Sequence, residues 1–309
     1  RIREDFIPDE DALSVARLKT AGAVIIGKSN TPEFAHDINT KNDVFGVTRN
    51  PWNTDHTAGG SSGGTAAAIA SAMVPAGLGT DLGGSIRIPS AFCGTVGLRP
   101  PPGRAPVHPA EFGWDTLVEH VQGPMAATVA DLGLMLSVLA GPDDRDPSSL
   151  PAQGHDYVAA GSGDIAIDGS RIAFCADFGG VAPIDPEIGN LVATAVGTFA
   201  ECGAVVEEAY FDIDGLPDII AGTRAFGMVG RYADLLDTQR DVMTPPLLNQ
   251  ASEAMTFDVR TIADAGDVLP QQGFCACRLI LFLERAPVLP GDSPFPFGVV
   301  APRPPTVLD

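Results

Sequence analysis

Apolar residues recur along the chain with spacings that separate helices from strands. Over residues 9–22 they recur at helical intervals, behind acidic residues and before a glycine, which predicts a helix. The unbroken apolar run 23–26 predicts a fully buried strand. The small residues of 65–73 predict a helix that can pack closely on a sheet. Behind Pro75, residues 76–80 predict a short buried strand.

The same alternation returns in the second half of the chain. Residues 171–175 predict a strand, a helix follows from about residue 185 to 203, and residues 204–206 begin another strand. Such an order is typical of a βαβ unit. The apolar stretch 132–140 is too short to span a bilayer, which takes about 20 residues, and predicts a core helix. The pattern therefore predicts an α/β protein with helices on the faces of a sheet.

Two proline-rich segments interrupt this pattern. Residues 142–151 are polar and contain three prolines, which favours a surface loop between the two halves of one fold. Residues 286–305 contain seven prolines in twenty positions and can form neither a helix interior nor a central strand. We expect this end to be irregular.

Charge and cysteine content narrow the class of protein. The formal net charge of −20 repels phosphate backbones and anionic lipids, so we expect no binding to nucleic acid or to membranes. No secretory signal opens the chain, and five scattered cysteines are too few for a disulfide framework, which together favour the cytoplasm. Cys275 and Cys277 lack a second pair at zinc-site spacing, so we expect no metal.

Two glycine-rich loops hold the candidate chemistry. Residues 59–64 read Gly-Gly-Ser-Ser-Gly-Gly, and residues 79–87 place Ser85 24 positions after Ser61. Between the loops lie the predicted helix 65–73 and the predicted strand 76–80. Each serine therefore stands at the end of a regular element, where unpaired backbone N–H groups gather.

Three simpler interpretations of the first loop are weaker. Residues 60–64 match the nucleophile elbow of an α/β-hydrolase with Ser62 as nucleophile, but a polar loop precedes them where a buried strand is required. The histidines that follow are not convincingly placed either. A phosphate-binding loop lacks the Lys-Ser/Thr that should follow the glycines. Glycines that serve only close packing would suffice if the loop stood alone.

The wider context resembles the amidase signature enzymes. The order of motifs carries this resemblance: Asp11-Ala12, residues 21–30, Glu33-Phe34, Asn50-Pro51-Trp52, the double-glycine serine loop, and Gly79 through Cys93-Gly94 to Gly97-Leu98. It is dense over residues 8–147, persists to about residue 235, and is faint beyond. It implies a single domain over residues 1–309, incomplete at both ends, with a core at 1–141, a surface linker at 142–155 and a less similar half at 156–309.

The resemblance also implies an activity and its residues. The fold would be α/β, with a mixed β-sheet sandwiched between helical layers. Ser85 would be the nucleophile that forms an acyl-enzyme on a small-molecule amide, and Ser61 the bridging serine behind a cis Gly60–Ser61 peptide bond. The backbone N–H groups of Leu82, Gly83, Gly84 and Ser85 would form the oxyanion hole. No cofactor is implied, and a homodimer is compatible with the family.

Nearby polar residues have expected supporting roles. Asp81 is expected to accept hydrogen bonds that brace the two serine loops. For Arg87, a buried structural ion pair is favoured over a contact with the substrate. Ser62 could bind substrate, although capping the following helix is the favoured role. Lys28 follows a predicted strand, but in the family this lysine is not the catalytic one.

The chain departs from the family at the catalytic base. The family's neutral lysine belongs to an apolar strand upstream of the segment matching residues 8–30, and no such motif is present. We therefore expect a fragment or a deletion that is a very slow amidase. A non-catalytic homologue is the second hypothesis. The third is the amidase component of a tRNA-dependent amidotransferase, which the acidic charge and residues 107–121 do not favour.

Overall fold

The computed structural model describes residues 2–109, 120–163, 167–209, 216–258 and 260. The predicted features at Cys275, Cys277 and residues 286–305 lie outside these ranges. The chain divides into two compact units, the first formed by Arg1–Gly163 and Arg224–Phe257 and the second by Asp164–Thr223 and Asp258–Asp309. Residues 224–238 of the long helix α7 (Leu216–Thr238) belong to the first unit.

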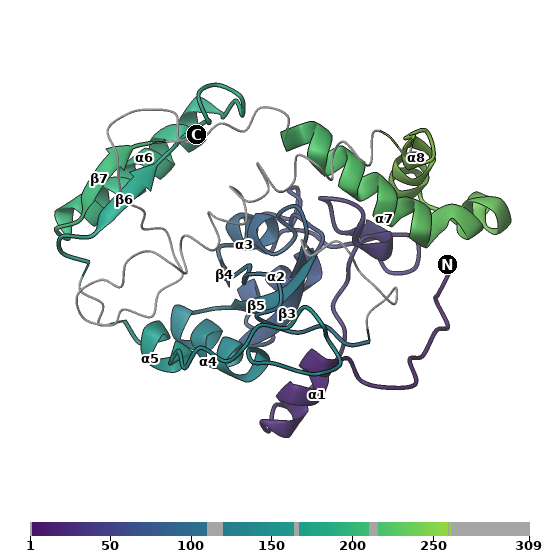
Figure 1. Ribbon diagram of the computed structural model, residues 1–309, viewed down its shortest axis with the longest axis horizontal. Coiled ribbons are helices and arrows are strands. Elements are labelled where there is room, and N and C mark those ends of the chain that lie inside the picture. Colours follow the sequence, from purple (N-terminus) through teal and green to yellow (C-terminus); the bar gives the residue numbers. More distant parts are fainter. Residues whose placement is uncertain (1, 110–119, 164–166, 210–215, 259, 261–309) are drawn as a thin grey trace. The chain divides into compact units, whose positions relative to one another are not determined.

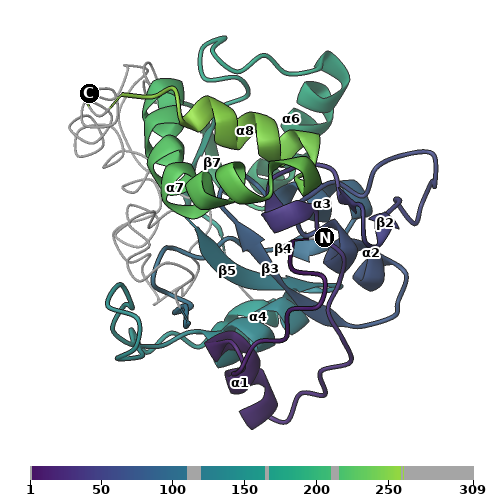
Figure 2. The same ribbon diagram turned by 90° about the vertical axis from the view of Figure 1, so that its right-hand side faces the viewer.

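The first unit contains the elements that hold both serine loops (Figures 1 and 2). In chain order they are α1 (Leu13–Thr20), η1 (Glu33–Ala35), β1 (Lys41–Asn42), β2 (Gly46–Val47), α2 (Gly63–Ala70), β3 (Ala76–Asp81), α3 (Arg87–Cys93), β4 (Val96–Gly97), β5 (Val121–Ala126), α4 (Val129–Leu139), α5 (Tyr157–Gly161), η2 (Arg240–Val242) and α8 (Pro245–Ala254).

A three-stranded antiparallel sheet in the order β3-β5-β4 forms the centre of this unit. Its register pairs Asp81 with Val121 and Gly79 with Gly123. Alternate side chains of a strand point to opposite faces, so each face carries its own core. Met125 packs with residues of α2 and α3, whereas Ala126 packs against α4. Helices thus cover both faces of the sheet, as expected for the predicted α/β layers (Figure 1).

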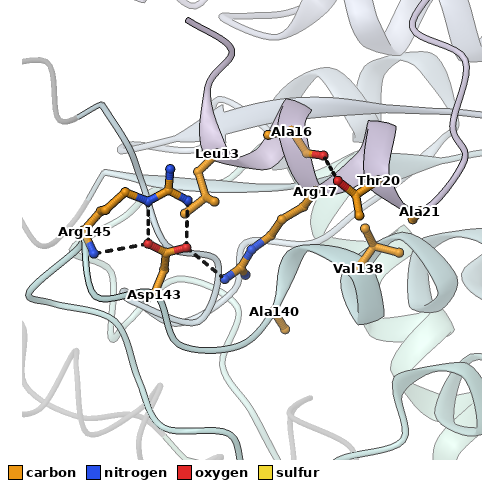
Figure 3. A pocket seen from close by; sticks show the side chains of 9 residues that line it. All are labelled: Leu13, Ala16, Arg17, Thr20, Ala21, Val138, Ala140, Asp143 and Arg145. Atoms are coloured by element: carbon orange, nitrogen blue, oxygen red, sulfur yellow. Dashed lines mark hydrogen bonds and ion pairs between the residues drawn. The ribbon is translucent and has the colours of Figure 1, made fainter.

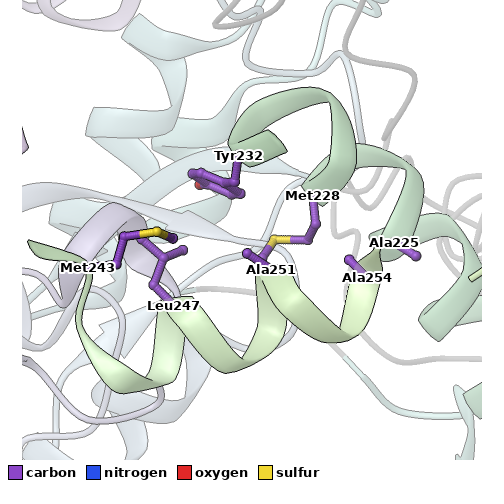
Figure 4. Close-up of a cluster of buried hydrophobic side chains, with 7 residues drawn as sticks. All are labelled: Ala225, Met228, Tyr232, Met243, Leu247, Ala251 and Ala254. Atoms are coloured by element: carbon purple, nitrogen blue, oxygen red, sulfur yellow. The ribbon is translucent and has the colours of Figure 1, made fainter. Parts of the chain in front are cut away.

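A second small core joins α7 to α8 within the first unit. Buried side chains of both helices meet in this core, together with Met243, which precedes α8. The buried members are Ala225, Met228, Tyr232, Met243, Leu247, Ala251 and Ala254 (Figure 4). Residues 33–36 reach this helix pair, because the Glu33 carboxylate accepts hydrogen bonds from the backbone N–H and the hydroxyl of Thr244, at 2.7 and 2.8 Å.

The second unit contains the predicted βαβ motif. The strands β6 (Arg171–Phe174) and β7 (Val205–Glu208) are parallel and are joined through α6 (Pro186–Glu201). Asp185 caps α6 by accepting the N–H of Glu187 at 2.8 Å, and Pro186 occupies the first turn, where its missing N–H is harmless. Antiparallel pairing in one unit and parallel pairing in the other confirm the α/β class.

Most predicted elements of the first half are confirmed, with shifted ends. The predicted helix 9–22 forms only over α1, and the predicted strand 76–80 is β3. The predicted core helix is α4, begun by Thr128, whose hydroxyl accepts the Asp131 N–H at 3.1 Å. Helices of the described residues include none with the length and apolar character needed to cross a bilayer.

The expectation of a buried strand at residues 23–26 is wrong. The segment lies outside every strand of the structure, and Val24 and Ile26 are 84% and 73% exposed. Apolarity predicts burial only where another strand lies alongside, and among the described residues none pairs with this segment.

Residues 142–150 belong to the first unit and are held by contacts within it. The guanidinium of Arg17 donates hydrogen bonds to the carbonyl oxygens of Gly141 and Pro142, at 3.1 and 3.0 Å. Asp146, only 8% exposed, accepts the N–H of Val107 at 2.8 Å. These contacts fix the start of the proline-rich loop on the unit that contains both serine loops.

Candidate active site

The first serine loop is buried at the start of α2. Ser61 and Ser62 are 1% and 4% exposed, and the peptide bond between Gly60 and Ser61 is cis. Small side chains are required here because other backbone segments touch the loop. A Cβ on Gly64, for example, would overlap both the backbone N and the backbone O of Asn30. A Cβ on Gly59 would likewise stand 2.9 Å from Pro89 Cα, so segments both before and after the loop in the chain enclose it.

Thr40 holds this loop from inside the turn. Its side chain is fully buried, and its hydroxyl donates a hydrogen bond to the carbonyl oxygen of Gly59 at 2.8 Å. The same hydroxyl oxygen accepts the N–H of Gly63, the first residue of α2, at 3.1 Å. Thr40 thus satisfies one of the unpaired donors at the helix start. Sequence reasoning missed this residue.

Ser62 does not cap α2, so the favoured role for its side chain is wrong. It occupies the N-cap position, but its hydroxyl makes no capping hydrogen bond. That oxygen instead accepts the N–H of Thr80 at 3.2 Å and lies 3.4 Å from the carbonyl oxygen of Thr80. Thr65, one turn into α2, likewise donates its hydroxyl to the carbonyl oxygen of Leu78 at 3.0 Å. Because β3 is an edge strand of the described sheet, these hydroxyls satisfy backbone groups that no strand pairs.

The second serine loop is a turn built on Asp81, the last residue of β3. The Asp81 side chain is fully buried, and its carboxylate accepts the N–H groups of Gly84 and Ile86 at 2.8 and 3.1 Å. The turn needs glycine at position 84, where φ is +106°. In this structure the Gly84 N–H is thus directed at Asp81. Ser85, half-buried, follows at the end of the turn.

Two arginines compensate the charge of Asp81. Arg87 donates two hydrogen bonds to the carboxylate, from Nε at 3.0 Å and from an Nη atom at 2.9 Å. The Nε atom of Arg99 lies 3.5 Å from the same group. The Arg87 side chain is 55% exposed, so the expected ion pair is present but only its acidic partner is buried. Within the described part of the chain, Asp81 is the group that the Arg87 guanidinium binds.

The environment of Asp81 keeps it ionised. Burial by itself raises the pKa of the carboxyl group, because a charge is poorly solvated inside the protein. The hydrogen bonds and charge of Arg87 and the N–H groups of Gly84 and Ile86 outweigh burial, so the pKa lies below its usual range. The turn before Ser85 is therefore held by a permanent negative charge at neutral pH.

One backbone contact joins the two loops. The N–H of Ser62 donates to the carbonyl oxygen of Ser85 at 3.1 Å. Ile86, fully buried next to Ser85, packs in the same core as Ala66 of α2. The structure therefore brings together the two serine loops that the spacing of the motifs predicts as partners.

The Asn-Pro-Trp motif supports the helix that follows Ser85. The side-chain amide of Asn50 donates to the carbonyl oxygen of Phe92 at 2.8 Å, and the indole N–H of Trp52 donates to that of Cys93 at 2.7 Å. Both carbonyls belong to the last turn of α3, which has no later helical donors for them. Trp52 itself is 74% exposed.

All three lysines of the chain are exposed. Lys19 pairs with Asp11 at 2.7 Å, while the side chains of Lys28 and Lys41 make no hydrogen bond or ion pair with another described residue. A lysine that acts as a base must be neutral, which requires burial or nearby positive charge. The structure places no lysine of this chain in such an environment.

The described residues contain no cluster of three or more His, Cys, Asp or Glu side chains that could hold a metal ion. Their cysteines, Cys93, Cys175 and Cys202, are free thiols. Burial raises the pKa of the Cys93 thiol, which makes it a weak nucleophile.

A surface pocket of about 490 Å³ lies apart from the serine loops, between α1 and the end of α4 (Figure 3). Both arginines of the pocket make hydrogen bonds within the protein. Arg17 donates to the carbonyl oxygen of Leu139 at 2.6 Å, and Arg145 makes two hydrogen bonds to Asp143. Its lining residues are Leu13, Ala16, Arg17, Thr20, Ala21, Val138, Ala140, Asp143 and Arg145. None of them is a candidate catalytic residue.

Comparison with known proteins connects this geometry to a family. A family model described as Amidase matches residues 1–246. A protein of Roseiflexus sp. (strain RS-1), described as one of the subunits of glutamyl-tRNA(Gln) amidotransferase, is 44% identical over 210 residues. The match covers 67% of this chain and 42% of that relative. The chain thus spans less than half the length of this curated relative.

Solved structures lead to the same family. The structure of a bacterial aryl acylamidase, described as an amidase signature enzyme, superposes with a TM-score of 0.78 at 30% identity, over 89% of this chain and 57% of that one. The structure of 6-aminohexanoate cyclic dimer hydrolase complexed with substrate gives a TM-score of 0.76 at 28% identity, over 85% and 56%.

Proposed function

The chain belongs to the amidase family, and on that premise we propose that it hydrolyses an amide C–N bond through an acyl-enzyme on Ser85. The observation that carries the proposal is the hydrogen bond from the Ser62 N–H to the Ser85 carbonyl oxygen, because it joins the loops of Ser61 and Ser85 and so supports their assignment as relay and nucleophile. The near-complete burial of Ser61 supports the bridging role, because a proton relay works best where bulk water is excluded.

The proposed reaction has two steps. The hydroxyl oxygen of Ser85 attacks the amide carbonyl carbon while its proton passes to the Ser61 oxygen and the Ser61 hydroxyl gives its own proton to a general base. Collapse of the tetrahedral intermediate breaks the C–N bond, and the amine leaves with a proton delivered through Ser61. Water then attacks the acyl ester, releases the carboxylic acid and restores the Ser85 hydroxyl.

The turn before Ser85 supplies the proposed oxyanion donors. The N–H groups of Leu82, Gly83 and Ser85 make no hydrogen bond with another described residue, and the Gly84 N–H is held by Asp81. We therefore assign the oxyanion to those three donors and a conformational role to Gly84. Each such donor contributes about 10² to 10³ in rate.

The base that receives the proton from Ser61 is assigned to none of this chain's lysines. Lys19 is ion-paired, and Lys28 and Lys41 are exposed, so none has the burial that a neutral lysine requires. Activated esters, whose leaving groups need less acid catalysis, are therefore the substrates with which Ser85 of this chain should react most readily.

Acylation of Ser85 by p-nitrophenyl acetate tests the proposal directly. Mass spectrometry of the intact protein and of its peptides should find one acetyl group, located on Ser85. Ser85→Ala should abolish it, whereas Ser71→Ala, which alters an exposed serine at the end of α2, should leave it unchanged. Acetylation spread over several residues, or retained in Ser85→Ala, would contradict the assignment.

A second candidate is the amidase component of a glutamyl-tRNA(Gln) amidotransferase. The observation in its favour is the identity of 44% to a protein described as belonging to that enzyme. The strongly acidic charge argues against RNA binding by this chain itself. Release of ammonia from glutamine separates the two: faster release from glutamine than from simple aryl amides would favour the amidotransferase.

We also propose a small-molecule amide as substrate and the cytoplasm as location. Free thiols at the described cysteines support a reducing compartment. Labelling the protein in cells, with fractionation, tests the location.

A further inference from the structure

We propose that Thr40 is a positioning residue whose hydroxyl sets the place of Ser61 relative to Ser85. The inference rests on the function proposed above for these two serines. Thr40 lies 21 positions before Ser61 and belongs to neither glycine-rich loop.

The hydrogen bonds of Thr40 enclose the turn that presents Ser61. A hydroxyl has one proton to donate and two lone pairs that accept. The proton goes to the carbonyl oxygen of Gly59 at 2.8 Å, and the oxygen accepts the N–H of Gly63 at 3.1 Å. The carbonyl oxygen of Ser61 lies 3.4 Å from the same hydroxyl. One buried group is thus bonded on both sides of the Gly60–Ser61 peptide.

The close packing around the Thr40 hydroxyl leaves no room for another hydrogen-bonding group in its place. A Cβ at position 63 would overlap Thr40 Oγ1 and stand 2.9 Å from Thr40 Cβ. Thr40 is fully buried, so no water can replace its hydroxyl without displacing the loop. In the observed turn, the Thr40 hydroxyl satisfies both the Gly59 carbonyl and the Gly63 N–H.

Loss of the hydroxyl should affect chemistry more than binding. Ser61 must stand within hydrogen-bond reach of Ser85 to relay a proton, and an error of about 1 Å in such a site lowers the rate by about 10²-fold. Thr40 is fully buried and offers no surface that a substrate could contact. Thr40 acts through the loop and touches no reacting atom, which distinguishes it from Ser61 and Ser85.

Three variants in the 309-residue protein separate this role from general stability. Thr40→Val removes the hydroxyl at nearly constant volume, and Thr40→Ser retains it. Thr95→Val is the matched control, because the buried Thr95 hydroxyl has no hydrogen-bond partner among the described residues. Thr40→Cys, with its weaker donor, replaces Thr40→Val if that protein does not fold.

The measurement is the rate of Ser85 acetylation against p-nitrophenyl acetate concentration. Thr40→Val should lower the saturating rate by about 10²-fold and change the half-saturating concentration by less than about threefold. Thr40→Ser and Thr95→Val should stay within about threefold of the wild type in both. Amide hydrogen exchange should accelerate in residues 59–66 of Thr40→Val and stay unchanged elsewhere.

Several results would overturn the proposal. Equal acetylation rates in Thr40→Val and the wild type would do so. An acetylation rate as low in Thr40→Ser as in Thr40→Val would also do so, because the methyl group would then matter more than the hydroxyl. Faster exchange throughout the first unit would show a stability effect alone. If the wild type itself is not acetylated at Ser85, the proposed function fails. Unchanged amide exchange in residues 59–66 of Thr40→Val would separately show that the Thr40 hydroxyl does not hold the loop.

Discussion

The backbone N–H of Ser62 donates a hydrogen bond to the carbonyl oxygen of Ser85 at 3.1 Å. This contact joins the end of one glycine-rich loop to the end of the other. Between them run only a helix and an edge strand, and the strand is bound to the helix start by the Ser62 hydroxyl. The two loops are therefore in direct backbone contact next to both serines.

Replacing Asp81 by asparagine should destabilise the first unit strongly. Asp81→Asn removes the buried carboxylate that Arg87 binds, and breaking a buried ion pair costs about 3 kcal/mol of unfolding free energy. Arg87→Gln should cost only about 1 kcal/mol, because the half-exposed arginine regains water and Asp81 keeps its backbone donors. Urea unfolding at pH 7 measures both. Equal losses would show that the charge of Asp81 is not buried as described.

Gly64→Ala should destabilise through a steric clash with the backbone. The added Cβ would overlap the N and O atoms of Asn30, and overpacking of this kind costs about 1–3 kcal/mol or more. Gly230→Ala is the matched control, because it lies inside α7 with no described atom within 4 Å of the added Cβ. There the change should stabilise by up to about 1 kcal/mol. A tolerated Gly64→Ala would contradict the close approach.

Sequence alone could predict the serine pair because its signals are local. Glycine-rich turns, the small-residue helix and the strand between them all lie within about 30 positions, and each is recognisable by itself. Thr40 escaped because its partners lie 19 to 23 positions away and threonine is common in loops. No sequence pattern links a threonine at this distance to the turn whose backbone groups it binds.

The two wrong expectations have a common cause. The neighbouring residues favour a buried strand at residues 23–26 and a helix cap at Ser62. The outcome instead depends on what lies alongside: no described strand pairs with the first, and the exposed edge of β3 offers the Ser62 hydroxyl a partner at Thr80. Tertiary partners thus override local preference at both places.

Removing the Ser62 hydroxyl should loosen β3 rather than α2. Ser62→Ala leaves the Thr80 N–H without a partner, at a cost of about 1–3 kcal/mol. Amide exchange should accelerate at Thr80, while the first turn of α2 stays protected because Thr40 still accepts the Gly63 N–H. Ser137→Ala, an exposed serine on α4, is the control. Faster exchange at residues 63–66 with Thr80 unchanged would restore the capping role.

Stability of the first unit should fall between pH 6.5 and pH 4 because of His36. Burial, followed by the charges of Arg224 and Arg231, lowers the pKa of His36 from 6.5 to about 4. The unfolded chain therefore binds a proton over this interval that the folded chain does not, so stability is complete above about pH 6.5 and is lost as the pH falls. The loss can reach about 3 kcal/mol.

The neutral ring of His36 holds residues 33–36 against the helix pair. Its Nε2 atom lies 2.8 Å from the hydroxyl of Tyr232, and its backbone carbonyl accepts the side-chain amide of Gln250 at 2.9 Å. His36→Gln removes the titrating group while keeping a polar side chain. The urea midpoint should fall less steeply from pH 8 to pH 4 in this variant than in the wild type. Carboxylates titrate in both proteins, so the difference between the two pH profiles reports the contribution of His36. Parallel pH profiles for the variant and the wild type would show that His36 is not buried in the neutral form.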